Sequence, residues 1–264
     1  MSEGGTVGKA MRVLDQVASF GRPVRFADLQ TGSDLPKATL YRLVQTLTQQ
    51  SLLSFDPDQH TYSLGMRLVR LAHAAWQQSS LAPVAQPFLD ALSAELGETV
   101  HLAQLDHAQV LYVDKRNAAQ PVKMFSDAGK VGPAYCTGVG KAMLAFLDDM
   151  TLERVLGQQS YHRFTPNTLC SPQDLRTELM RTRARGFAFD CEEHEPGIIC
   201  VAVPILGASG RVMGAMSVTG STTRTSLDNL ADLAPRLCAT AALIAKEAET
   251  WAFPENDTGQ RTGT

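Results

Sequence analysis

Residues 35–64, LPKATLYRLVQTLTQQSLLSFDPDQHTYSL, decide how the first part of the chain folds. Their first apolar positions recur at the spacing of one helix face, as Leu40, Leu43, Val44 and Leu47. We expect this helix to run from Pro36, a residue that the first turn of a helix accepts, to about Gln50. Two strand-like runs, 52–55 and 60–64, flank the turn-forming sequence DPDQ, which predicts a β-hairpin.

Two shorter helices are expected upstream of this stretch. Residues 7–20 carry apolar side chains at helical spacing and are followed by Gly21, and a second helical segment spans 26–31. The polar sequence Gly-Ser-Asp at 32–34 then predicts a turn before the helix at 36–50. Helix, helix, turn, helix and hairpin is the order of a winged helix-turn-helix.

The polar face of the helix at 36–50 suits the major groove of double-stranded DNA. It carries Lys37, Ala38, Thr39, Tyr41, Arg42 and Gln45. Arginine pairs with guanine and glutamine with adenine, while lysine, threonine and tyrosine contact phosphates. Many proteins that bind no DNA also have a solvated charged helix face, so the helix-turn-helix order carries this hypothesis. Charge supports it, because residues 1–74 hold 8 basic and 6 acidic side chains and the remainder holds 16 and 21.

The rest of the chain predicts a second domain of the α+β class. A helical pattern over 66–80 indicates a linker helix, and a further helix is expected at 81–96. Strand-like runs follow at 99–105, 109–114, 198–206 and 211–219, and helical patterns at 138–148, 172–185 and 226–250. We expect domains at 1–65, 66–80 and 81–252, with a disordered tail at 253–264.

Composition excludes several classes of protein. With 44% hydrophobic and 19% charged residues, the 264-residue chain resembles an average globular protein. It has no apolar run near the roughly 20 residues that a membrane helix needs and no signal-peptide pattern, so we expect a cytoplasmic protein. The five cysteines are widely spaced, and no second histidine lies at ligand spacing from His194. We therefore expect no disulfide framework, no metal site and no cofactor.

Four ordered motifs resemble those of the IclR-type bacterial transcription regulators. They lie at 35–43, at 62–65, at 138–142, and at 190–193 leading to 197–204. The resemblance covers nearly all of the chain, from about 8 to 248. It implies an N-terminal winged helix-turn-helix, a linker helix and a C-terminal GAF-like domain with an antiparallel sheet and flanking helices. It also implies a homodimer, or a dimer of dimers, on operator DNA.

The resemblance further implies a site for an effector, a small molecule that changes DNA binding. Its residues would be Gly138, Val139, Asp190, Ile198, Cys200, Ser217 and Thr219. Alternation along a strand places Ser217 and Thr219 on one side, and likewise Ile198 and Cys200. Asp190 either accepts a hydrogen bond from the effector or caps a turn, and Met124 either forms an apolar wall or packs in the core.

Charged residues near these motifs leave alternatives open. The glycines of the sequence TGVGK at 137–141 either leave backbone N–H groups open to an anion or form a tight helix start without a ligand. Lys141 either pairs with a carboxylate of the effector or is a solvent-facing or salt-bridged residue, so we leave it out of the site. Glu192, Glu193 and His194 resemble a metal or acid/base set, but a solvated charged loop is more common.

Two departures from the family pattern affect the expectations. Asp34 occupies the turn position where the family usually has glycine, and aspartate tolerates the left-handed conformation better than most residues. Tyr135 and Cys136 replace smaller residues, which changes the expected shape of the effector pocket.

The function expected from these observations is a repressor of a catabolic operon. Its effector would be a small organic acid, either carboxylic or sugar-derived. Binding of this acid would alter the spacing of two DNA-binding domains across the linker. A contact with RNA polymerase is a further partner that the sequence leaves open. One alternative is a hydrolase with Cys200 or Cys136 as nucleophile and His194 or His101 as base, although a thiol buried in a strand reacts poorly. A ligand-independent architectural or RNA-binding protein is another.

Overall fold

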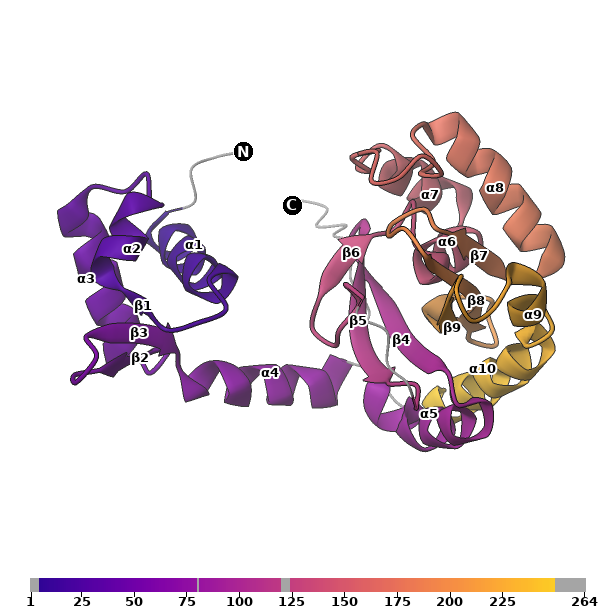
Figure 1. Cartoon of the computed structure of the whole chain (residues 1–264), viewed down its shortest axis with the longest axis horizontal. Coiled ribbons are helices and arrows are strands. Elements are labelled where there is room, and N and C mark those ends of the chain that lie inside the picture. Colours follow the sequence, from indigo (N-terminus) through magenta and orange to yellow (C-terminus); the bar gives the residue numbers. More distant parts are fainter. Residues whose placement is uncertain (1–4, 80, 120–123, 250–264) are drawn as a thin grey trace, which may run out of the picture. The chain divides into compact units, whose positions relative to one another are not determined.

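The computed structural model describes residues 5–79, 81–119 and 124–249. Figure 1 shows the chain, which divides between Gln78 and Ser79 into two compact units. The predicted tail at 253–264 lies outside the described residues.

The first unit is a winged helix-turn-helix, as the sequence predicts. Its elements are α1 (Thr6–Ser19), β1 (Val24–Arg25), α2 (Phe26–Thr31), α3 (Lys37–Gln49), β2 (Leu53–Asp56), β3 (Thr61–Leu64) and α4 (Met66–Ser79). The three strands pair antiparallel in the order β1-β3-β2, and the two-residue strand β1 was not predicted from the sequence. The apolar stripe of α3 is buried and packs against Val13, Val17 and Leu29.

Two details at the start of α3 differ from the expectations. Pro36 is the N-cap of α3 and does not lie within its first turn. Asp34 is not among the described non-glycine residues with positive φ, so this turn does not need the left-handed conformation that was expected to favour glycine. After the hairpin, a Cβ on Gly65 would lie 2.2 Å from the carbonyl oxygen of Ser51, which explains the glycine of the 62–65 motif.

The second unit contains a six-stranded antiparallel sheet with helices on both faces. Its elements in chain order are α5 (Ala82–Leu96), β4 (Thr99–Asp106), β5 (Gln109–Arg116), β6 (Val131–Pro133), α6 (Gly138–Leu144), α7 (Asp149–Leu156), α8 (Pro172–Arg185), β7 (Ala188–Cys191), β8 (Ile198–Leu206), β9 (Val212–Ser221), α9 (Leu227–Ala231) and α10 (Ala234–Ala248). The strand order is β6-β5-β4-β9-β8-β7. The α+β class and the antiparallel sheet with flanking helices are therefore confirmed.

Alternation along the central strands separates two cores. Ala103 of β4, Ala202 of β8 and Ala215 of β9 pack with the apolar side chains of α6, α7 and α8. Their neighbours along the strands, such as Leu102 and Val203, are also buried and point to the opposite face, where α5 and α10 lie against the sheet. The face of the sheet that carries Ala103, Ala202 and Ala215 therefore packs against α6.

Several predicted boundaries in this unit were wrong. The helix expected at 138–148 ends as α6 at Leu144, and the separate helix α7 begins at Asp149, where the side chain of Asp148 caps it. The helix expected at 226–250 is divided into α9 and α10. The short strands β6 and β7 were missed, because three or four residues give little periodic signal.

Candidate functional site

The predicted DNA-facing residues lie on α3 with unequal exposure. Lys37, Ala38, Tyr41 and Arg42 are exposed, whereas Thr39 and Gln45 are half-buried. Tyr41, which is 54% exposed, packs edge-on against Phe26 of α2 with ring centroids 5.7 Å apart. This contact fixes a large side chain at the surface near the start of α3.

Gln45 is tied to the small sheet as well as to the helix surface. Burial raises the pKa of the Tyr62 phenol, the nearby Tyr41 raises it further, and a side-chain hydrogen bond with Gln45 lowers it. Tyr62 belongs to β3, so Gln45 connects α3 to the hairpin. Gln45 thus lies on the predicted polar face of α3 but is only half-exposed.

A polar cavity lies between the start of α6 and the face of the large sheet. It has about 410 Å³ of empty space, part of which is open to solvent. Its lining residues are His101, Tyr112, Phe125, Ser126, Thr137, Gly138, Val139, Asp190, His194, Glu195, Ile198, Cys200, Ser217 and Thr219. Seven of the predicted effector residues thus meet at one cavity; Met124 is buried but is not part of this lining, which its neighbour Phe125 joins instead.

His101 is the central cavity residue that the predicted effector site did not include. Its Nε2 lies 2.8 Å from Ser126 Oγ, and its Nδ1 lies 3.2 Å from Thr219 Oγ1 and 3.5 Å from Ser217 Oγ. Burial, and then the positive charge of Lys115, lower the pKa of His101 to about 3, so the imidazole is neutral at pH 7. His101 lies opposite Ser217 in the β4–β9 register, which only the folded sheet specifies.

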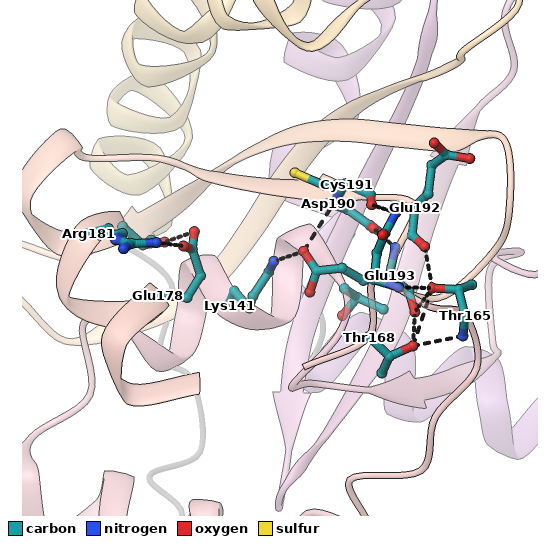
Figure 2. A network of polar contacts seen from close by, with 12 residues as sticks. Lys141, Thr165, Thr168, Glu178, Arg181, Asp190, Cys191, Glu192 and Glu193 are labelled. Atoms are coloured by element: carbon teal, nitrogen blue, oxygen red, sulfur yellow. Dashed lines mark hydrogen bonds and ion pairs between the residues drawn. The ribbon is translucent and has the colours of Figure 1, made fainter. Parts of the chain in front are cut away.

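Asp190 both caps a turn and lines the cavity, so the two alternatives for its role are compatible. Its Oδ1 accepts a 2.8 Å hydrogen bond from the backbone N–H of Glu193. Burial, and then the negative charge of Glu193, raise the pKa of Asp190 to about 7, while Lys141 opposes this shift. Figure 2 shows Asp190 beside Glu193 at the end of β7.

Lys141 and Glu193 form a buried ion pair next to the cavity (Figure 2). Lys141 is 1% exposed and its ammonium group is paired with Glu193, so of its expected alternatives the salt-bridged one holds. The expectation of a solvated loop at 192–194 is wrong for Glu193, which is buried, and the hydroxyl of Thr168 donates a 2.6 Å hydrogen bond to its backbone oxygen. Among the described residues, Glu193 Oε2 is the buried side-chain atom without a hydrogen-bond partner.

The glycines at the start of α6 permit close packing against protein atoms. A Cβ on Gly138 would lie 2.3 Å from the Sγ of Cys200, and a Cβ on Gly140 would lie 2.3 Å from the carbonyl oxygen of Ala134. The tight helix start that was one of the two expectations is therefore present, and Gly138 lines the cavity as well.

The chemistry of the cavity does not favour nucleophilic catalysis. Burial raises the pKa of the thiols of Cys136 and Cys200, so both stay protonated at pH 7. No group of three metal-ligating side chains occurs in the part of the chain that the structure describes. Within the same ranges, no helix is both long and apolar enough to cross a membrane.

Comparison with known proteins assigns both units. Residues 6–57 match the IclR helix-turn-helix domain, and residues 73–246 match the bacterial transcriptional regulator IclR C-terminal domain. The HTH-type transcriptional regulator XynR of Escherichia coli is 32% identical over 232 residues, which cover 88% of this chain and 92% of that protein. The Pca regulon regulatory protein of Pseudomonas putida is 31% identical and covers 84% of this chain and 77% of its own length.

Solved structures agree with this assignment. The structure of Thermotoga maritima IclR has a TM-score of 0.76 and 27% identity, and the match covers 92% of this chain and 98% of that one. An IclR homologue from Microbacterium hydrocarbonoxydans, complexed with 4-hydroxybenzoate, shares the fold with a TM-score of 0.80 at 23% identity over 93% of this chain and all of its own. These relatives are regulators and not enzymes, so the hydrolase alternative falls. This chain belongs to the IclR family of bacterial DNA-binding transcription regulators.

Proposed function

We propose that this regulator represses a catabolic operon and that a small organic acid, held in the polar cavity, modulates its binding to operator DNA. The observation that carries the proposal is the cavity itself, in which hydroxyl groups and a neutral imidazole from separate strands converge. The relative bound to 4-hydroxybenzoate supports an acid as the class of effector.

The hydrogen-bonding groups of the cavity suit a compact oxygen-rich molecule. Ser126, Ser217 and Thr219 supply hydroxyl groups, and burial raises the pKa of Tyr112, so its phenol keeps the proton that it can donate. A carboxylate needs such donors, whereas the carboxyl groups of Asp190 and Glu195 can accept hydrogen bonds from hydroxyl groups of a hydroxy acid. Ile198 and Val139 add apolar contacts.

The DNA-binding half of the proposal rests on α3. Lys37 and Arg42 are exposed on the helix that occupies the recognition position of the helix-turn-helix. We assign Arg42 and Gln45 to base edges, and Lys37, Thr39 and Tyr41 to phosphates, while the small side chain of Ala38 allows close approach to the groove.

The proposed assembly is a homodimer, or a dimer of dimers, that uses α4. Met66 and Val69 follow each other at helical spacing on α4 and are 72% and 58% exposed. Exposed apolar side chains of this size favour a partner surface. A dimer would present two copies of α3 to operator half-sites about one helical turn apart or a multiple of it.

The test is a binding screen with three acids of different classes, namely 4-hydroxybenzoate, pyruvate and gluconate. An acid at about 100 times its dissociation constant should stabilise the folded protein by about 2.7 kcal/mol, which a thermal shift detects. The same acid should change the affinity for the DNA upstream of the neighbouring operon. Binding of DNA with no response to any of the acids would favour a ligand-independent architectural protein.

A matched pair of variants connects the response to the cavity. Ser217→Ala removes a cavity hydroxyl on β9 and should weaken acid binding about tenfold, as expected for one lost hydrogen bond to a charged group. Ser221→Ala is the control, because Ser221 lies on the same strand, bonds to Thr223 and does not line the cavity. Equal losses in both variants would place the acid elsewhere.

A further inference from the structure

The charges around the cavity are unfavourable to an anion. Two carboxyl groups, those of Asp190 and Glu195, line the cavity, and its described lining contains no lysine or arginine. Lys141 is the nearby buried cation, but its ammonium group is paired with Glu193. Of the two acidic groups, Glu195 has the imidazole of His194 beside it, with Oε1 3.8 Å from Nδ1, whereas Asp190 has no such partner in the described lining.

Asp190 is the carboxyl group most exposed to repulsion from a bound carboxylate. Its side chain is buried to 7% exposure, and the described residues give it one hydrogen bond, from the backbone N–H of Glu193 to Oδ1. Its second oxygen, Oδ2, is thus left for the cavity. Glu195 differs, because it is half-buried and its Oε1 already accepts a 2.9 Å hydrogen bond from the backbone N–H of Phe125.

Titratable and charged groups face Asp190 from every element packed against it. They are Lys141 on α6, Cys191 on β7, Glu193 and His194 in the loop after β7, Cys200 on β8, Cys136 before α6 and Tyr112 on β5. Burial raises the pKa values of the three thiols and of the phenol, so these four groups stay neutral near pH 7. The opposite charges of Lys141 and Glu193 neutralise each other in their ion pair. Among the described residues, Asp190 is therefore the buried carboxyl group of the cavity lining that has no ion-pair partner, although His194 also acts on it.

We infer that Asp190 takes up one proton from solvent when a carboxylate binds, and that its protonated Oδ2 then donates a hydrogen bond to the bound carboxylate. This inference rests on the proposed acid sensor. It adds that the protein takes up one proton together with each acid anion that it binds. One O–H bond forms on Asp190 while a hydronium ion or a buffer acid gives up its proton, and the charges of the bound anion and of the proton cancel in the complex. Without the proton, two carboxylates would share a buried site, which is strongly unfavourable.

The carboxyl group is suited to this exchange near neutral pH. Burial and the charge of Glu193 raise its pKa to about 7, so both forms of the free protein are populated there. Above about pH 8, where free Asp190 is ionised, the dissociation constant of an acid should rise about tenfold for each pH unit. Below about pH 6, where Asp190 already carries the proton, the affinity should level off, as long as the acid itself stays ionised.

Isothermal titration calorimetry tests the inference on the full chain. The three acids 4-hydroxybenzoate, pyruvate and gluconate are titrated at about pH 8.5 in two buffers of different ionisation enthalpy. The difference in apparent binding enthalpy gives the number of protons taken up, which we expect to be about one at pH 8.5 and near zero at about pH 5.5. Binding that takes up no proton at pH 8.5 would overturn the inference and leave the acid sensor intact.

Two variants assign the proton to its residue. Asp190→Asn keeps an acceptor for the Glu193 N–H and mimics the neutral acid, so it should bind the same acid without proton uptake and with a nearly constant affinity above pH 7. Glu195→Gln makes the same change in the other cavity carboxyl group and should retain the uptake. Loss of uptake in Glu195→Gln alone would contradict the assignment to Asp190. If none of the acids binds the unmodified chain, the proposed acid sensor and this inference both fall.

Discussion

Gly138 is the residue on which the closeness of α6 to the sheet depends. An alanine Cβ would lie 2.3 Å from Cys200 Sγ and 3.3 Å from the Cβ of Ala202, and both neighbours lie on a buried central strand. Its φ is not positive, so the cost of Gly138→Ala comes from this overlap and not from backbone strain. We expect this variant to lose about 1–3 kcal/mol of the free energy of unfolding, measured by urea denaturation.

Two further variants test that reason. Gly157→Ala is the control within the same unit, because its Cβ would meet nothing closer than 3.6 Å and its stability should change little. Cys200→Ala removes the Sγ atom, so the cost of Gly138→Ala should shrink in that background by about 0.5 kcal/mol or more. Strictly additive costs would mean that the overlap with Cys200 is not the cause.

His101 gives the protein a defined response to acid. Its pKa is about 3 in the folded chain and near 6.5 in an unfolded one, so between these values the unfolded state binds the extra proton. Stability from this group is therefore lost as pH falls from about 6.5 toward 3. Asp190 acts in the opposite sense, since its raised pKa adds stability as pH falls from about 7 toward 4.

The His101→Gln variant separates the two contributions. It should be less stable than the unmodified chain at about pH 7.5, because its amide cannot repeat all contacts with Ser126 and Thr219. The difference should narrow as pH falls below about 6.5, because glutamine has no proton to gain. Thermal unfolding of both proteins at several pH values measures this difference in stability. A difference that does not change with pH would contradict a buried neutral imidazole at His101.

At the scale of the element, α3 predicts two different DNA-binding defects. Arg42→Ala should remove the preference for operator over other DNA, because a bidentate arginine contact to guanine discriminates by about 1–3 kcal/mol. Lys37→Ala should weaken binding to all duplexes and lower the slope of log affinity against log salt by about 1. Fluorescence anisotropy at several salt concentrations distinguishes the two. Arg154→Ala, an exposed arginine of the other unit, is the control, and unchanged operator preference in Arg42→Ala would exclude this helix.

The exposed apolar residues of α4 give a prediction about the stability of the proposed dimer. A charge at its exposed apolar stripe, as in Val69→Glu, should raise the dissociation constant of the dimer at least tenfold, by about 1.4 kcal/mol or more, because a buried unpaired carboxylate is costly. Sedimentation equilibrium measures this constant. Val131→Glu on β6 makes the same change at another exposed valine and should leave association unchanged. A dimer that tolerates Val69→Glu would exclude α4 from the interface.

The elements differ in how far the sequence could predict them. The long periodic helix α8 has the expected bounds, and α3 differs by one residue at each end, because a buried stripe and a cap leave a clear pattern. The strand β7 has four residues at the edge of the sheet, and only its pairing with β8 brings Asp190 to the cavity. His101 was outside the predicted effector site for the same reason, since its partner Thr219 is 118 residues away.

At the scale of the whole molecule, the DNA-binding helix and the proposed acid sensor occupy different units. The helix α3 belongs to the first unit and the cavity to the second. Each unit has its own buried core, so each site is supported independently of the other. A response of DNA binding to the acid therefore requires that the acid stabilise one arrangement of the proposed dimer more than another.

That coupling must be reciprocal, which gives the last prediction. If the acid changes the affinity for operator DNA by a given factor, operator DNA must change the affinity for the acid by the same factor, and we expect about 5–150-fold. The acid is titrated into the free protein and into the protein saturated with operator duplex, and operator is titrated with and without the acid. A duplex of shuffled sequence is the control, because it should engage phosphates without fixing the spacing of the two copies of α3. A factor of one in both titrations would mean that the cavity and α3 act independently, even in a protein that binds both ligands.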